Sequence, residues 1–277
     1  YYYHENVYRP SAESHTFQEI SQMGLEMLGA VGEAQVQQAV RLAAQSLAQL
    51  GAAWVLEVSH MGYLFGLFDA LGVPENARPG LLEKLREKNA HELRRAAQAA
   101  GLDAAGAAAL TGLLELSGSC EETLAKAESA CRNDRMRAAA AELRALAKTL
   151  EASGGAVRLD LSLAGEMEYY NGLVFQGYLQ GLPRPLLKGG RYDLLMQKFT
   201  PGARAIGFAV YLDELDRLSA PTPPVQRNST GRVMLNVALP KGRLGDRVYD
   251  LLARIGYGCT EDYNATRKLV VENPAAG

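Results

Sequence analysis

Alternating apolar and polar residues predict strands along the chain. Val157, Leu159, Leu161 and Leu163 alternate with polar residues, which is typical of a half-buried strand. Residues 1–8 are aromatic and extended in character, and 17–28 are suited to pair with them antiparallel across the polar loop at 11–15. Short apolar runs predict three more strands, at 53–58, 173–179 and 205–211. The last of these leads into a short helix that ends at Leu218.

Helical spacing of apolar residues dominates the rest of the first 152 residues. Val36, Val40, Ala43 and Leu47 predict a helix that stops at Gly51. The alanine-rich stretch at 61–150 also predicts helices, with one apolar stripe formed by Met136, Ala140, Leu143, Ala147 and Leu150. Residues 153–155 read Ser-Gly-Gly and break this block. The pattern indicates an α+β fold, an antiparallel sheet with a helical insertion at about 61–152.

A proline-rich stretch at 219–231 predicts an exposed linker, and we place a domain boundary there. Residues 1–218 then form one domain and 232–277 a short α/β segment. In that segment 233–239 is a predicted buried strand, followed by a turn that contains Lys241 and Arg243. A basic turn at the carboxyl end of a strand, opening a helix, is a natural anion site. Lys241 and Arg243 are therefore candidate phosphate-binding residues.

Composition narrows the class of protein. The 277 residues are 48% hydrophobic and 22% charged with a net charge of −2, which is ordinary for a globular protein and leaves no electrostatic footprint for nucleic acid. The three cysteines have neither disulfide nor metal spacing, and no signal peptide or membrane-spanning run is present. We expect a cytoplasmic protein with no metal and no cofactor. Because the chain opens without methionine inside a predicted strand, we expect it to belong to a longer gene product.

Three motifs resemble the catalytic core of histidyl-tRNA synthetases, which are class II aminoacyl-tRNA synthetases. They are Glu-Tyr-Tyr-Asn-Gly at 168–172, Gly-Gly-Arg-Tyr-Asp at 189–193 and Ala-Ile-Gly-Phe-Ala at 205–209. The resemblance implies the class II fold. It also shows three departures, since the family has arginines where this chain has Gly165 and Glu214, and a glycine where it has Tyr211. Charge is thus removed or reversed where a triphosphate would bind, so we expect no catalytic residues.

The same resemblance implies a pocket for free histidine. Gln22 corresponds to a residue near the α-amino group, Glu26 to one that accepts from an imidazole N–H, and Tyr170 to one that meets the other ring nitrogen. Tyr169 and Arg191 belong to the same predicted pocket, and Gly24 should leave room for the ligand. Arg9, in a stretch similar to the second class II motif, is a further candidate for phosphate binding. The Gly-Gly pair at 189–190 is expected in a hairpin turn beside this site.

Residues 235–244 and 267–273 resemble the opening of ATP phosphoribosyltransferase, whose phosphoribosyl-pyrophosphate loop has no counterpart here. One family explains both resemblances, the regulatory subunit of short-form ATP phosphoribosyltransferase, a synthetase paralogue. It implies a histidine-sensing regulatory role in histidine biosynthesis, with L-histidine and the catalytic subunit as partners and a homodimer within a hetero-oligomer. No membrane is implied, nor is tRNA expected to bind. The alternatives are a histidyl-tRNA synthetase or a subunit of one, and a stand-alone histidine-binding protein.

Overall fold

The computed structural model describes residues 1–10, 16–150, 156–164, 169–219 and 253–254. The chain divides into two compact units, Tyr1–Ser219 and Ala220–Gly277. Several predicted features lie outside the described residues. They are the loop at 11–15, the break at 153–155, Gly165, Glu168, residues 220–231 of the linker, Lys241, Arg243 and the strand and turn around them.

The described part of the first unit contains one eight-stranded sheet with the order β1-β2-β8-β7-β6-β3-β5-β4. Its strands are β1 (Tyr2–Pro10), β2 (Phe17–Gly29), β3 (Trp54–His60), β4 (Ser117–Ser119), β5 (Ala156–Asp160), β6 (Leu173–Leu179), β7 (Leu187–Arg191) and β8 (Arg204–Tyr211). Neighbouring strands are antiparallel except β3 and β5, which run parallel. The predicted pairing of the first two strands is confirmed, with Tyr2 opposite Leu25 and Pro10 opposite Phe17.

The predicted strand at 157–163 is shorter than its alternation indicates. β5 ends at Asp160, whose carboxylate accepts hydrogen bonds from the Ser162 backbone N–H at 3.0 Å and the Ser162 hydroxyl at 2.5 Å. A side chain that binds the backbone two residues ahead forms a turn, and this turn ends the strand. Leu161 stays buried all the same.

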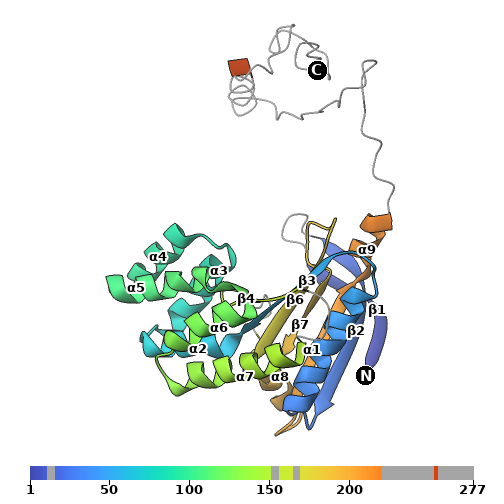
Figure 1. Cartoon of the computed structure of the whole chain (residues 1–277), viewed down its shortest axis with the longest axis horizontal. Coiled ribbons are helices and arrows are strands. Elements are labelled where there is room, and N and C mark those ends of the chain that lie inside the picture. Colours follow the sequence, from blue (N-terminus) through green and yellow to red (C-terminus); the bar gives the residue numbers. More distant parts are fainter. Residues whose placement is uncertain (11–15, 151–155, 165–168, 220–252, 255–277) are drawn as a thin grey trace. The chain divides into compact units, whose positions relative to one another are not determined.

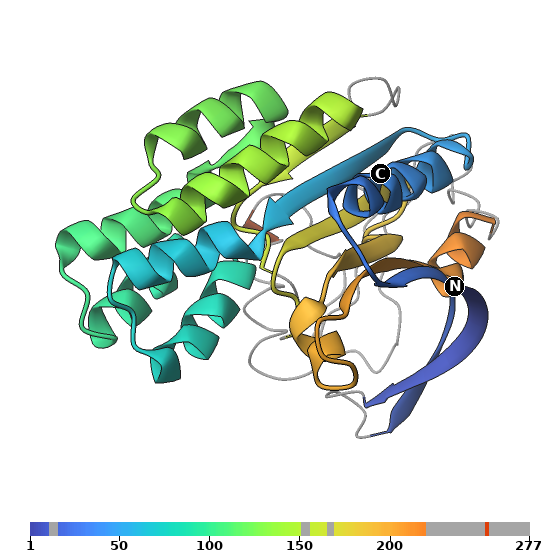
Figure 2. The ribbon, with the colours of Figure 1, turned by 90° about the horizontal axis from the view of Figure 1, so that it is seen from below.

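Helices fill the stretch from Met61 to Leu150, as its periodicity predicts, but it also contains the short strand β4, which the sequence analysis does not predict. The α-helices of the first unit are α1 (Glu33–Ala48), α2 (Met61–Ala70), α3 (Arg78–Arg86), α4 (Ala90–Ala99), α5 (Ala104–Thr111), α6 (Cys120–Ser129), α7 (Asp134–Leu150), α8 (Asp193–Gln197) and α9 (Leu212–Ser219). The helices α2 to α7 gather at the β4 end of the sheet, and the β1–β2 hairpin lies at the opposite end (Figures 1 and 2). None of the helices within the described ranges is long and apolar enough to cross a bilayer.

Helix α1 covers one face of the sheet and builds much of its core. Its buried stripe includes Val36, Val40 and Leu47, the residues that predict the helix. Leu47 lies against Gly177 of β6, where an added Cβ would come within 2.6 Å of it. Side chains alternate along a strand, so Leu173, Phe175 and Gly177 face α1 while Val174 and Gln176 face the other side. That other side of the sheet carries the cavity described next.

Candidate functional site

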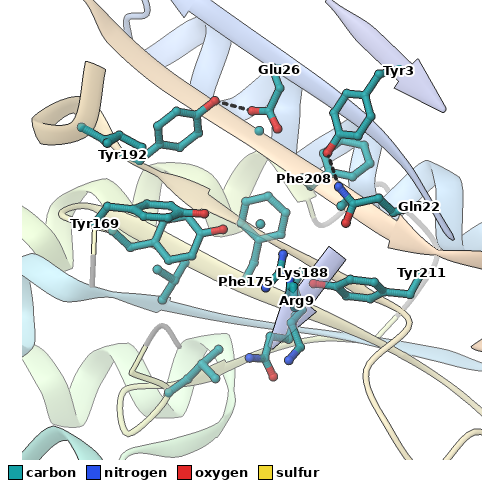
Figure 3. Close-up of a pocket in the computed structure, with 18 residues that line it drawn as sticks. Tyr3, Arg9, Gln22, Glu26, Tyr169, Phe175, Lys188, Tyr192, Phe208 and Tyr211 are labelled. Atoms are coloured by element: carbon teal, nitrogen blue, oxygen red, sulfur yellow. Dashed lines mark hydrogen bonds between the residues drawn. The ribbon is translucent and has the colours of Figure 1, made fainter. Parts of the chain in front are cut away.

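A cavity of about 280 Å³ lies on the sheet face opposite α1 (Figure 3). Strand register arranges its floor in rows, because residues directly opposite one another on antiparallel strands point to the same side. One row runs Glu26, Gly207, Gly190 and Val174 across β2, β8, β7 and β6. The next row, two residues along, runs Gly24, Ala209, Lys188 and Gln176. Tyr211 lies opposite Gln22 one row further.

Small residues in the floor make space for the polar groups. A Cβ at Gly207 would overlap the Glu26 carboxylate, and a Cβ at Gly190 would come within 2.7 Å of the Tyr170 ring. The Gly-Gly pair at 189–190 therefore lies inside β7 and not in the hairpin turn that the sequence analysis expects. Glycine is required there because large side chains cross the strand on both faces, Tyr170 over Gly190 and Phe175 over Gly189.

Glu26 forms the acidic part of the cavity. Its carboxylate accepts a hydrogen bond from the Tyr192 hydroxyl, and the two half-buried side chains face each other in Figure 3. Burial raises the pKa of Glu26 above its ordinary value, while the bond from Tyr192 acts to lower it. Burial and the neighbouring Glu26 carboxylate raise the pKa of Tyr192, so this phenol stays protonated and acts as a donor. A carboxylate has more than one free lone pair, so Glu26 can accept from a ligand N–H as well.

Three tyrosines form an aromatic wall beside Glu26. The ring centroids of Tyr169 and Tyr170 are 5.0 Å apart, and those of Tyr169 and Tyr192 are 5.8 Å apart, both edge to face. Burial raises the pKa of Tyr169 and of Tyr170. Neutral phenols can donate or accept a hydrogen bond, and their rings offer a flat apolar surface. This wall therefore suits a small aromatic ring with polar nitrogens.

Gln22 presents an acceptor into the same space. The residue is buried, its Nε2 donates to the Tyr3 hydroxyl at 2.9 Å, and its Oε1 is buried without a hydrogen-bond partner among the described residues. A buried acceptor left unpaired is costly, so it marks a place for a ligand donor. Tyr3 also occupies the room at Gly24, where an added Cβ would overlap its ring. The expectation that Gly24 leaves space for the ligand is thus wrong, since a side chain from β1 fills that space.

Two cationic side chains, Arg9 and Lys188, also line the cavity. Arg9 comes from β1 opposite Gln18, and its charge acts to lower the pKa of Tyr169. Lys188 comes from the middle of β7, and Figure 3 shows it on the same side as Arg9 and Tyr211. Both side chains are half-buried. The cavity therefore has cationic donors as well as the acidic Glu26.

The structure places Arg191, a predicted member of the pocket, on the opposite face of β7. Its guanidinium Nε donates to Asp193 at 2.7 Å, and its Nη1 lies 3.5 Å from the Glu142 carboxylate of α7. Glu142 also accepts from His60 Nε2 at 3.1 Å, and His60 Nδ1 accepts from the Gly62 backbone N–H, so the proton of the neutral ring lies on Nε2. These contacts tie the helical insertion to the sheet. Alternation explains the placement, because Gly190 and Tyr192 take the cavity side and Arg191 between them cannot.

The start of α9 carries the reversed charge that the sequence predicts. Asp213 accepts a hydrogen bond from the Ser21 backbone N–H at 3.1 Å, which fixes the helix start against β2. Glu214 Oε2 is buried, and the Arg217 guanidinium lies 3.6 Å from it. Tyr211, which precedes α9, lines the cavity. An acidic and bulky junction of this kind is a poor environment for the phosphates of a nucleotide.

Sequence reasoning missed Tyr3, Tyr192 and Lys188 as lining residues, and its candidates Gln22, Glu26, Tyr169, Tyr170 and Arg9 do line the cavity. Once β7 is known to be a strand, alternation would have identified Lys188 and Tyr192. They share one face of the strand with Gly190, whereas Gly189 and Arg191 take the other. No group of three or more potential metal ligands occurs within the described ranges.

Known proteins resemble the first unit closely. The family model described as Histidyl-tRNA synthetase matches residues 1–215. A curated ATP phosphoribosyltransferase regulatory subunit from Desulfitobacterium hafniense is 33% identical over 213 residues, which cover 76% of this chain and 55% of that protein. The chain thus spans about half the length of the curated relatives it matches.

Solved structures agree with this match. The structure titled ATP phosphoribosyltransferase regulatory subunit/histidyl-tRNA synthetase from Bacillus halodurans superposes with a TM-score of 0.69 at 32% identity, covering 78% of this chain and 57% of that one. A histidine–tRNA ligase subunit from Alicyclobacillus acidocaldarius gives 0.64 at 30% identity, covering 79% and 69%. The predicted α+β, class II synthetase-like fold is confirmed, and the chain belongs to the histidyl-tRNA synthetase family.

Proposed function

We propose that this chain is a histidine-sensing regulatory component of ATP phosphoribosyltransferase and is not catalytic by itself. The curated relatives are named as regulatory subunits of that enzyme, which supports the proposal. In this role the chain binds free L-histidine and biases phosphoribosyl transfer by a separate catalytic subunit. Such coupling between sites is typically worth about 1–3 kcal/mol. A homodimer within a hetero-oligomer and a cytoplasmic location belong to the same proposal.

The observation that carries the proposal is the combination of acceptors within one small cavity. Glu26 and the phenols of Tyr170 and Tyr192 suit the two nitrogens of an imidazole, and the unpaired Oε1 of Gln22 suits an ammonium group. The cavity volume of about 280 Å³ lies just below the range of roughly 300–1,000 Å³ that is usual for drug-binding pockets. An amino acid suits that volume better than an amino acid together with a nucleotide.

The second candidate is a histidyl-tRNA synthetase or a subunit of one, favoured by the name of the Alicyclobacillus structure. Tyr211 and Glu214 speak against it, because adenylate formation needs cationic groups on the phosphates. A stand-alone histidine-binding protein is the third candidate. It differs from the first only in having no effect on a catalytic subunit.

Calorimetric titration of L-histidine into the full chain tests the binding step. The wild type should bind, and Glu26→Ala should weaken binding by about 1–3 kcal/mol, because a buried ring N–H is left unpaired. Glu75→Ala is the matched control, since Glu75 is an exposed carboxylate before α3 and does not line the cavity. No heat with the wild type, or equal affinities for Glu26→Ala and Glu75→Ala, would count against the proposal.

A further inference from the structure

The cavity holds its acidic and cationic groups at separate positions on the sheet. Glu26 is on β2 and Lys188 on β7, with β8 between them, and the two residues lie in adjacent rows. Two strand spacings of about 4.8 Å and two residues of about 3.4 Å place their backbones roughly 10 Å apart across the strands and 7 Å apart along them. The acidic and the cationic side chain therefore enter the cavity from different strands and from different rows of the sheet.

A free α-amino acid has one group that the acidic part of the cavity cannot bind. Glu26, the phenols and Gln22 Oε1 account for a ring and an ammonium group, as proposed above. A carboxylate requires donors, and anionic acceptors bind cationic donors most strongly. Lys188 brings three ammonium donors and Arg9 five guanidinium donors to the cavity.

Lys188 is better placed than Arg9 to bind a ligand carboxylate. Lys188 belongs to a central strand, and the neighbours in its row are Ala209 and Gln176. Its neighbour Ala209 on β8 is small, and Figure 3 shows the Lys188 side chain in the cavity near Arg9 and Tyr211. Arg9 lies on the edge strand β1, opposite the exposed Gln18.

We propose that Lys188 is the residue that makes the pocket specific for a ligand with a free α-carboxylate. The inference rests on the proposed histidine function and adds a selection rule to it. L-Histidine carries the carboxylate, whereas esterified, reduced or adenylylated forms lack its full charge. A sensor built in this way responds to the free amino acid and ignores its activated derivatives.

The test compares two ligands on three proteins. L-Histidine and L-histidinol, in which a hydroxymethyl group replaces the carboxylate, are titrated calorimetrically into the full wild-type chain, Lys188→Met and Lys198→Met. Methionine keeps much of the lysine stem and removes the charge. Lys198 is exposed beyond α8 and does not line the cavity, so its variant controls for the loss of one positive charge.

The wild type and Lys198→Met should prefer L-histidine over L-histidinol by roughly 10- to 100-fold, the usual effect of a charge-assisted hydrogen bond. In Lys188→Met the ratio of the two dissociation constants should fall close to one, mainly through weaker L-histidine binding, while L-histidinol affinity stays nearly constant. Lys188→Arg should keep the preference, and this second variant separates loss of charge from loss of fold.

The outcomes separate the two proposals. L-Histidine binding with the same ligand preference in the wild type and Lys188→Met overturns the role of Lys188 and leaves the proposed function intact. A wild type that binds neither ligand overturns the proposed function and the role of Lys188 with it. Selective loss of the preference in Lys188→Met supports both.

Discussion

Tyr192→Phe is the most informative single change in the cavity, because it removes one hydroxyl and nothing else. The Tyr192 hydroxyl donates to the Glu26 carboxylate, and the ring makes an edge-to-face contact with Tyr169 at 5.8 Å. Phenylalanine keeps the ring contact and deletes the donor. The half-buried carboxylate then lacks the one side-chain donor that the described residues give it.

The expected cost depends on pH in a defined direction. A hydrogen bond to a charged group contributes about 1.5–3 kcal/mol, and half-burial places this one near 1.5 kcal/mol. Because the Tyr192 hydroxyl favours the ionised form of Glu26, its removal raises the pKa of Glu26 beyond the increase that burial already causes. Above the raised pKa, Tyr192→Phe should therefore lower the free energy of unfolding by the full amount. This decrease should become smaller as acid protonates Glu26 in both proteins.

Urea unfolding at a series of pH values measures this effect. Tyr8→Phe is the matched control, because the Tyr8 hydroxyl donates to the Glu19 carboxylate at 3.1 Å on the exposed face of the β1–β2 hairpin. Solvent competes for such a bond, so Tyr8→Phe should leave the free energy of unfolding unchanged. A Tyr192→Phe effect that is absent, independent of pH, or no larger than that of Tyr8→Phe would refute this reasoning.

Two further predictions concern the absence of adenylate formation and the ion pairs between α7 and the sheet. The chain should support no histidine-dependent ATP–pyrophosphate exchange, because Glu214 stands where a synthetase has an arginine; exchange well above background would favour the synthetase candidate. Glu142→Gln should lower the free energy of unfolding by about 1–3 kcal/mol near neutral pH, since a mostly buried carboxylate between His60 and Arg191 is lost. Although burial acts to raise the pKa of Glu142, the hydrogen bond from His60 and the nearby Arg191 guanidinium lower it overall, so this contribution is present above the ordinary pKa of glutamate and lost as pH falls through the lowered one. Thermal unfolding against pH checks it, and a Glu142→Gln effect no larger than that of Glu128→Gln, in an exposed pair with Arg144, would contradict it.

Local patterns in the sequence predict most of the secondary structure, because each depends on residues a few positions apart. Val36, Val40 and Leu47 predict α1 and are all in its buried stripe. Gln22 and Glu26 lie an even number of positions apart on β2, which predicts that their side chains share one face of the sheet. Both line the cavity. These features follow from the helical and strand periodicities alone.

Features that depend on distant partners could not be predicted in this way. The three residues of β4 pair with β5, about forty positions later, and no local pattern marks them. The Gly-Gly pair of β7 resembles a turn because the rings that require glycine, from Tyr170 and Phe175, lie on other segments. Arg191, which the family resemblance assigns to the histidine pocket, lies on the opposite face of β7. Once β7 is a strand, alternation assigns Tyr192 to the cavity and Arg191 to Glu142 of α7.

We propose above all that this chain regulates phosphoribosyl transfer in response to histidine without catalysing it. The most direct measurement is the rate of ATP phosphoribosyl transfer by a separately purified short-form catalytic subunit, recorded with and without the chain over a range of L-histidine concentrations. We expect no turnover by the chain alone. The mixture of both proteins should turn over, and L-histidine should inhibit that turnover. Glu26→Ala should weaken the inhibition. Turnover by the chain alone, or a mixture whose rate does not change with L-histidine, would contradict it.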